Sequence, residues 1–204
     1  MMNKYNFTIF GDSITYGAWD KQNGGWVNRL RLAYENSQPN DRFNFFNLGI
    51  SGENVLEVNE RFDRECQHRI KKDEYNMIII AIGINDSQTR SNKDYVPLPI
   101  FETTLKELIQ KAKTYTNNLL ILGLTKVDET FCTPRKNSPH IYYYNHKIKQ
   151  YDSIIKQTSL ENKIDYLYLY DLLNNNELSD GLHPNEIGHQ KMCDIIKNKI
   201  DQMI

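Results

Sequence analysis

The chain has 204 residues, of which 39% are apolar, enough for one buried core in a single domain spanning residues 1–204. Its formal net charge is −1, so no overall field attracts nucleic acid or an anionic membrane surface. The three cysteines are odd in number and widely spaced, which favours reduced, buried thiols over a disulfide framework or a cysteine metal site.

No part of the chain has the pattern of a targeting or membrane segment. The first ten residues resemble a mixed strand and lack the apolar core and cleavage site of a secretory signal. The longest apolar stretch, residues 77–84, is too short to cross a bilayer. We therefore expect a cytoplasmic protein, with secretion from a trimmed precursor as the alternative. The sequence indicates no oligomeric state.

Five short apolar runs alternate with helical patterns along the chain. The runs predict strands at residues 5–10, 42–48, 77–82, 119–124 and 164–169. The third contains three consecutive isoleucines, which is typical of a central parallel strand buried on both faces. Between the runs, apolar residues recur with helical spacing, as at Leu105, Leu108, Ile109 and Ala112.

This alternation predicts an α/β fold in which parallel strands are joined by right-handed helical crossovers. We expect a three-layer α/β/α domain with about five strands and no internal linker. Two longer irregular segments, residues 87–99 and 126–139, follow predicted strands and should lie at the carboxyl edge of the sheet. Segments of this length often cover or border a functional site.

A candidate nucleophile and its base lie at opposite ends of the chain. Ser13 follows the first predicted strand in Gly11-Asp12-Ser13, where side chains project into the ligand crevice of α/β proteins. A serine hydroxyl needs an adjacent base, and His183 can supply it. Asp180 lies three residues earlier, so one turn brings its carboxylate to the imidazole. The simpler alternatives are a helix-capping serine and an Asp-Gly turn.

Two further residues follow the second and third predicted strands. Gly49 should leave its backbone N–H accessible to a ligand. Asn85 offers a side-chain N–H donor that does not titrate. Both suit the stabilisation of an oxyanion, although each also fits an ordinary turn. Asp12 and Asp86 are expected to brace the turns that carry Ser13 and Asn85.

Taken together, these blocks resemble the SGNH hydrolases, also called GDSL esterases and lipases, over residues 7–189. The resemblance implies a flavodoxin-like sheet with strand order 2-1-3-4-5 and no cofactor or metal. It implies Ser13 as nucleophile, His183 as general base and Asp180 as its orienting partner. The implied oxyanion hole comprises the Ser13 N–H, the Gly49 N–H and the Asn85 amide.

The expected activity is hydrolysis of a carboxylic ester through an acyl-enzyme on Ser13. The partner is a small-molecule ester, with a weak preference for short acyl groups such as acetyl on a carbohydrate. Trp19, Arg90, Lys93 and Tyr95 are candidate contacts for the substrate. Alternatives are a lysophospholipase or thioesterase of the same family and a catalytically silent protein that binds an acylated ligand. A phosphorylatable α/β regulator is disfavoured, since the first strand ends without an acidic pair.

Overall fold

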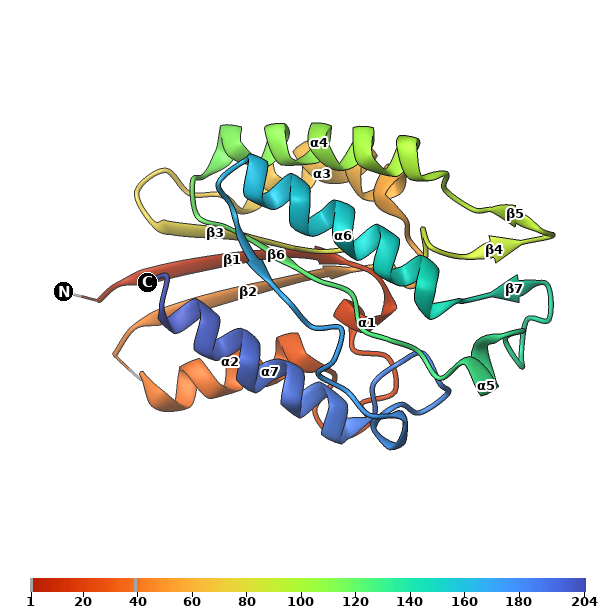
Figure 1. Ribbon diagram of the computed structural model, residues 1–204. Coiled ribbons are helices and arrows are strands. Elements are labelled where there is room, and N and C mark those ends of the chain that lie inside the picture. The colour runs from red at the N-terminus through yellow and green to blue at the C-terminus, as the bar shows by residue number, and fades with distance from the viewer. Residues whose placement is uncertain (1, 39) are drawn as a thin grey trace.

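A five-stranded parallel sheet forms the centre of the computed structural model, which describes residues 2–38 and 40–204. The strand order is β2-β1-β3-β6-β8 (Figure 1), which confirms the predicted order with β6 and β8 as the fourth and fifth strands. The strands are β1 (Lys4–Gly11), β2 (Arg42–Gly49), β3 (Tyr75–Ala81), β6 (Leu119–Leu122) and β8 (Asp165–Leu167).

The last two strands are shorter than predicted. β6 ends before residue 124 because the Leu124 N–H donates to the Asp152 carboxylate at 2.8 Å instead of to a neighbouring strand. β8 is an edge strand that pairs only with the last three residues of β6, and it ends at Leu167. Both strand ends therefore turn into loops at the carboxyl edge of the sheet.

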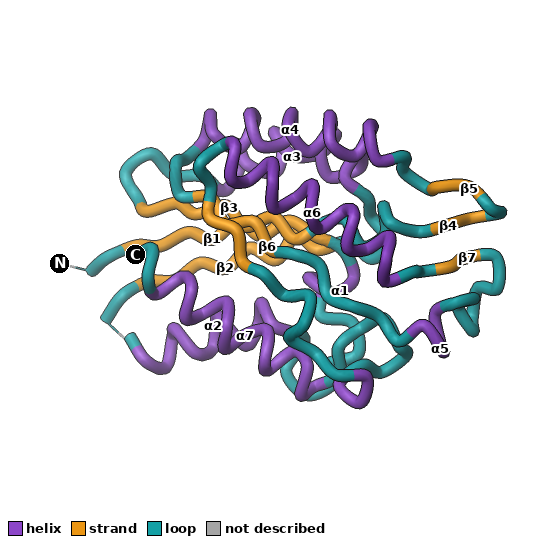
Figure 2. The backbone as a smooth tube through the Cα atoms, viewed as in Figure 1, coloured by secondary structure: helices purple, strands orange, loops and turns teal. Residues whose placement is uncertain are grey.

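Helices cover both faces of the sheet, as the three-layer prediction requires (Figures 1 and 2). One face carries α2 (Trp26–Ser37) and α7 (Glu186–Asp201). The other carries α3 (Val55–Arg69), α4 (Leu98–Tyr115) and α6 (Asn145–Glu161). The helical stripe predicted around Leu105 and Leu108 is fully buried in α4. Within the described residues, no helix has the length and apolarity needed to span a bilayer.

The core lies between these layers. Phe7 and Phe10 on β1 have no exposed surface, and the three isoleucines of β3 at residues 78–80 are at most 1% exposed. Phe7 also stacks on its register partner Phe45 of β2, with ring centroids 4.4 Å apart. Each fully buried side chain of this size contributes about 1.5–3 kcal/mol, so the carboxyl end of β1 rests on a rigid support.

A second, smaller sheet lies beyond the carboxyl edge and was not expected from the sequence. It pairs β5 (Lys93–Asp94), β4 (Thr89–Arg90) and β7 (Ile141–Tyr142) in antiparallel fashion. The sheet ties the segment at 87–99 to the end of the segment at 126–139, which contains the short helix α5 (Glu129–Cys132). The two predicted irregular segments thus form one connected rim (Figure 1).

Candidate active site

Ser13 is the first residue of a short helix, α1 (Ser13–Tyr16), that begins just beyond β1. The Asp12 carboxylate accepts the N–H of Ile14 at 2.9 Å and so caps this helix, as the bracing role predicted. Gly11 lets the end of β1 lie close to the end of β3, since a side-chain carbon at this position would lie 2.6 Å from the Ala81 carbonyl oxygen. The Ser13 hydroxyl is therefore held by the backbone at the carboxyl end of β1.

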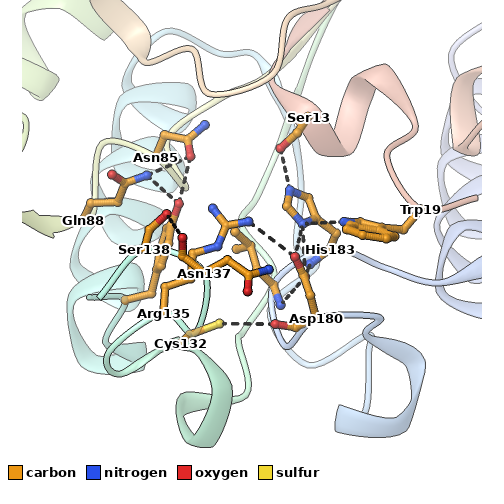
Figure 3. A network of polar contacts seen from close by, with 12 residues as sticks. Ser13, Trp19, Asn85, Gln88, Cys132, Arg135, Asn137, Ser138, Asp180 and His183 are labelled. Atoms are coloured by element: carbon orange, nitrogen blue, oxygen red, sulfur yellow. Dashed lines mark hydrogen bonds and ion pairs between the residues drawn. The ribbon is translucent and has the colours of Figure 1, made fainter. Parts of the chain in front are cut away.

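The structure brings Ser13, His183 and Asp180 into one line (Figure 3). Ser13 Oγ lies 2.8 Å from His183 Nε2, and Asp180 Oδ2 lies 2.9 Å from His183 Nδ1. Asp180 Oδ1 also accepts the backbone N–H groups of Leu182 and His183, at 3.1 and 2.9 Å. Gly181 makes this tight turn possible with a φ of 81°.

The charge on Asp180 decides which imidazole nitrogen carries the proton. Burial alone would raise the pKa of Asp180, but the hydrogen bond and charge of His183 hold this pKa well below its usual range. A guanidinium nitrogen of Arg135 lies 3.3 Å from Asp180 Oδ2. An ionised carboxylate at Nδ1 favours the tautomer protonated there, which leaves Nε2 free to accept the Ser13 proton.

Trp19 lies against the same imidazole, with its indole nitrogen 3.2 Å from His183 Nδ1. In the tautomer set by Asp180, both nitrogens carry hydrogen, so this short distance is a contact and not a hydrogen bond. Figure 3 shows Trp19 and Asn85 on opposite sides of His183. The indole thus borders the site on the side of the base.

The Asn85 amide is held in one orientation by a chain of hydrogen bonds. Its Oδ1 accepts from Tyr143 Oη and Gln88 Nε2, both at 3.0 Å. Its Nδ2 donates to the Glu53 carbonyl at 2.9 Å, which leaves the second N–H of that nitrogen without a partner among the described residues. Arg90 donates through Nε to the Gln88 side-chain oxygen at 2.7 Å, so it steadies the side chain that holds Asn85.

The prediction that Gly49 offers a free N–H is wrong. This N–H donates to the Asn47 side-chain oxygen at 3.0 Å. Gly49 also packs tightly in the structure, since a side-chain carbon at this position would lie 2.3 Å from the backbone nitrogen of Tyr16. The glycine is thus required for packing at the end of β2.

Gly52, in the same turn, has the properties expected of the backbone donor. Its φ is 88°, its side-chain position faces open space, and its N–H has no partner within residues 2–38 and 40–204. The next residue, Glu53, accepts the Asn85 amide through its carbonyl. The Ile50 N–H anchors the turn to the Gly11 carbonyl at 3.0 Å. We call residues 49–54 the oxyanion turn.

A buried ion pair that sequence reasoning missed supports the oxyanion turn. Arg61 of α3 donates to Glu53 through Nε at 2.8 Å and Nη2 at 2.5 Å, and Nη2 also reaches the Leu48 carbonyl at 2.6 Å. Both side chains are buried. One guanidinium thus fixes the residue before the turn and a residue within it.

Two buried carboxyls lie behind the site. Burial raises the pKa of Asp86 to about 7 and that of Asp12 to about 6. Asp86 accepts the Val55 N–H at 3.0 Å and so joins the Asn85 loop to α3, the bracing role expected of it. Across residues 2–38 and 40–204, no cluster of three or more histidines, cysteines and carboxylates is arranged to hold a metal ion.

Comparison with known proteins shows what the chain is similar to. No curated protein matches it. Among solved structures, Axe2, an acetylxylan esterase from Geobacillus stearothermophilus, has a TM-score of 0.75 and 20% identity over 97% of this chain and 94% of Axe2. LAE5, an alpha/beta hydrolase from the metagenome of Lake Arreo, Spain, has a TM-score of 0.71 and 19% identity over 99% of this chain and 96% of LAE5.

These structures share the fold of this chain, and fold alone does not assign a reaction. The family model for the GDSL-like Lipase/Acylhydrolase family matches residues 9–191. The match begins in β1, the strand that leads to Ser13, and extends past His183 into α7. The chain therefore belongs to the GDSL-like lipase/acylhydrolase family.

Proposed function

We propose that this carboxylic ester hydrolase cleaves short-acyl esters, chiefly acetyl esters of small polar alcohols such as sugars, through an acyl-enzyme on Ser13. The observation that carries the proposal is the hydrogen-bonded line from Ser13 Oγ through His183 to Asp180, with distances of 2.8 and 2.9 Å. A nucleophile, a base and the group that orients the base are the parts that acyl transfer requires.

In the first half-reaction, Ser13 Oγ attacks the ester carbonyl carbon while His183 Nε2 takes the hydroxyl proton. The negative charge on the carbonyl oxygen is stabilised by three N–H donors, from the Ser13 backbone, the Gly52 backbone and the Asn85 side chain. When the tetrahedral intermediate collapses, the bond to the alcohol oxygen breaks and His183 returns its proton to that oxygen. Asp180 stabilises the imidazolium in between.

In the second half-reaction, water takes the place of the alcohol. His183 removes a proton from water as its oxygen attacks the acyl carbon, and the same donors stabilise the second oxyanion. Collapse breaks the bond to Ser13 Oγ, which regains a proton from His183. The free acid leaves, and the enzyme is restored.

The surface beside the oxyanion turn supports a short acyl group. A cleft of about 610 Å³ opens next to Gly52, and its lining includes Glu57, Glu60, Arg61 and Arg64. Charged side chains lose hydration against an alkyl chain, so this cleft suits a polar ligand better than a long acyl tail. The shared fold with an acetylxylan esterase adds to this support.

The test uses Ser13→Ala, with Ser153→Ala of the exposed face of α6 as the matched control. We expect Ser13→Ala to lose hydrolysis of p-nitrophenyl acetate and labelling by a fluorophosphonate, while Ser153→Ala keeps both. In the wild type, kcat/KM for p-nitrophenyl esters should fall as the acyl chain lengthens from two to eight carbons. Full activity in a folded Ser13→Ala enzyme refutes the mechanism, and a preference for the longer esters refutes the assignment to short acyl groups.

A further inference from the structure

Trp19 combines backbone strain with exposure. It has a φ of 71°, a conformation that costs a residue with a side chain on the order of 1–3 kcal/mol. Its side chain is not buried in return, because 48% of Trp19 is exposed. The other tryptophan of the chain, Trp26, is fully buried in the core. Packing therefore does not explain the strain at Trp19, and strain of this kind clusters at ligand sites.

The loop that carries Trp19 is held firmly on both sides. On one side, the Ala18 carbonyl lies 3.0 Å from Nε2 of the buried His189. On the other, Asp20 accepts the N–H groups of residues 22, 23 and 25 and the Nε of Arg29 at 2.7 Å. Burial would raise the pKa of Asp20, but Arg29 and the backbone donors lower it to about 2. The indole is thus presented to the site by an ordered loop.

The position of the indole indicates which half of an ester substrate, the alcohol or the acyl group, it would face. Asn85, one of the proposed oxyanion donors, lies on the other side of His183 from Trp19 (Figure 3). The alcohol oxygen has to lie within reach of His183, which returns the proton to it. Trp19 contacts Nδ1 of that imidazole at 3.2 Å, on the side away from Asn85 (Figure 3), so we place its exposed surface beside the alcohol and not the acyl group.

A charged group lies on the other side of His183 from the indole (Figure 3). Arg135 contacts Asp180 Oδ2 through Nη2 at 3.3 Å, and the other N–H groups of its guanidinium have no acceptor in the described part of the chain. The site therefore offers a flat apolar surface at Trp19 and, across His183, hydrogen-bond donors without a partner. A pyranose ring has the matching chemistry, with C–H groups on its face and hydroxyls at its edge.

We infer that Trp19 is the stacking platform for the alcohol half of the substrate, and that this alcohol is a polyhydroxylated ring such as a pyranose. The inference rests on the proposed ester hydrolysis at Ser13 and adds the specificity for the leaving group. Trp19 does not take part in bond making. It places the sugar oxygen beside His183 during acylation and has no role in deacylation, when the sugar has left.

The kinetic test compares alcohols at constant acyl group. Trp19→Ala should lower kcat/KM for acetylated xylobiose about tenfold or more, chiefly through KM, which corresponds to the loss of a stacking contact. The loss on ethyl acetate, whose alcohol has no ring to stack, and any loss in the deacylation rate should be several-fold smaller than the loss on the sugar ester. Trp19→Phe should retain most activity on the sugar ester. Tyr168→Ala, which removes an equally exposed aromatic residue (48%), should behave as the wild type.

Three outcomes overturn the inference. An equal loss on ethyl acetate and on the sugar ester assigns Trp19 to His183 chemistry in general. A loss that follows the length of the acyl group places Trp19 on the acyl side. An unchanged kcat/KM for the sugar ester removes the platform altogether.

Fluorescence tests the platform without catalysis. In the Ser13→Ala background, xylobiose should produce a saturable change in tryptophan emission, because Trp19 is exposed and Trp26 is buried. The same titration in Ser13→Ala with Trp19→Phe should produce no change. Absence of the signal in Ser13→Ala overturns the inference. A wild type that binds xylobiose at Trp19 but hydrolyses no ester would refute the proposed function and leave the platform standing.

Discussion

Replacing Asp180 by asparagine would change the proton on His183 while keeping the size of the side chain. Asp180 Oδ1 accepts two backbone N–H groups, from Leu182 and His183. The introduced amide has to keep its oxygen at that position, since only an oxygen accepts both. Its NH₂ group then occupies the place of Oδ2, which lies 2.9 Å from His183 Nδ1.

A donor at that place reverses the imidazole tautomer. Nδ1 becomes the acceptor, and the ring proton moves to Nε2, which faces Ser13 Oγ at 2.8 Å. The base is then lost even though every side-chain position remains occupied. The equivalent change in a serine protease triad lowers kcat by about 10⁴, or roughly 5.5 kcal/mol of barrier. We expect Asp180→Asn to lower kcat on p-nitrophenyl acetate about 10³–10⁴-fold with little change in KM.

The assay is steady-state hydrolysis at pH 7, with thermal unfolding to show that the variant is folded. Asp128→Asn is the control, because Asp128 caps α5 with a similar hydrogen bond to the Thr130 N–H at 3.0 Å and contacts no member of the triad through its side chain. It should keep activity within about twofold of the wild type. A folded Asp180→Asn enzyme with more than about a tenth of wild-type kcat would refute the assignment of the tautomer to Asp180.

Three further predictions follow from the buried parts of the site. Gly52→Ala should fold and lose turnover about tenfold or more as its φ shifts. Gly49→Ala should instead lose stability, because its methyl would lie 2.3 Å from a backbone nitrogen. An active, stable Gly49→Ala enzyme contradicts this reasoning. The pKa of Asp86, raised by burial from 3.8 to about 7, means that the native state binds its proton more tightly than the unfolded chain. Wild-type stability should therefore fall between about pH 4 and 7 through this group. Asp86→Asn removes that loss. The difference in stability between the variant and the wild type, followed through Tm, should therefore shift in favour of the variant by on the order of 4 kcal/mol between pH 4 and pH 8. A difference in Tm that stays constant over this range contradicts the buried charge. Arg61→Met leaves Glu53 buried without its partner and should lower the free energy of unfolding, measured in urea, by about 3–5 kcal/mol. Adding Glu53→Gln should recover most of this loss. Equal losses in the single and double variants would count against the ion pair.

The strand order and the meeting of the triad residues were predictable because they depend on local patterns. Ser13 follows a buried strand, and parallel strands end at one edge of a sheet. Asp180 and His183 are three residues apart, so a single turn settles their contact. Each of these inferences needs only the period of the apolar residues and a short spacing.

The orientation of the oxyanion donors was not predictable in this way. Gly49 and Gly52 lie in one turn, and choosing between them requires a φ angle and the hydrogen-bond partner of each amide. The Asn85 amide is oriented by Tyr143, which is 58 residues away in the sequence. Arg90 was expected as a contact for a leaving group, and the two-residue strand that carries it has no periodicity to show that its Nε donates to Gln88.

The proposed nucleophile and its proposed base are 170 residues apart in the chain, and His183 lies just before the last helix, α7. At a synthesis rate of about 5–20 residues per second, Ser13 is made roughly 10–30 s before its base. During that interval the nascent chain has a serine without activation, so it can neither cleave esters nor become trapped as an acyl adduct. The first turnover has to await docking of α7 against α2. The time at which esterase activity appears therefore reports when folding is complete.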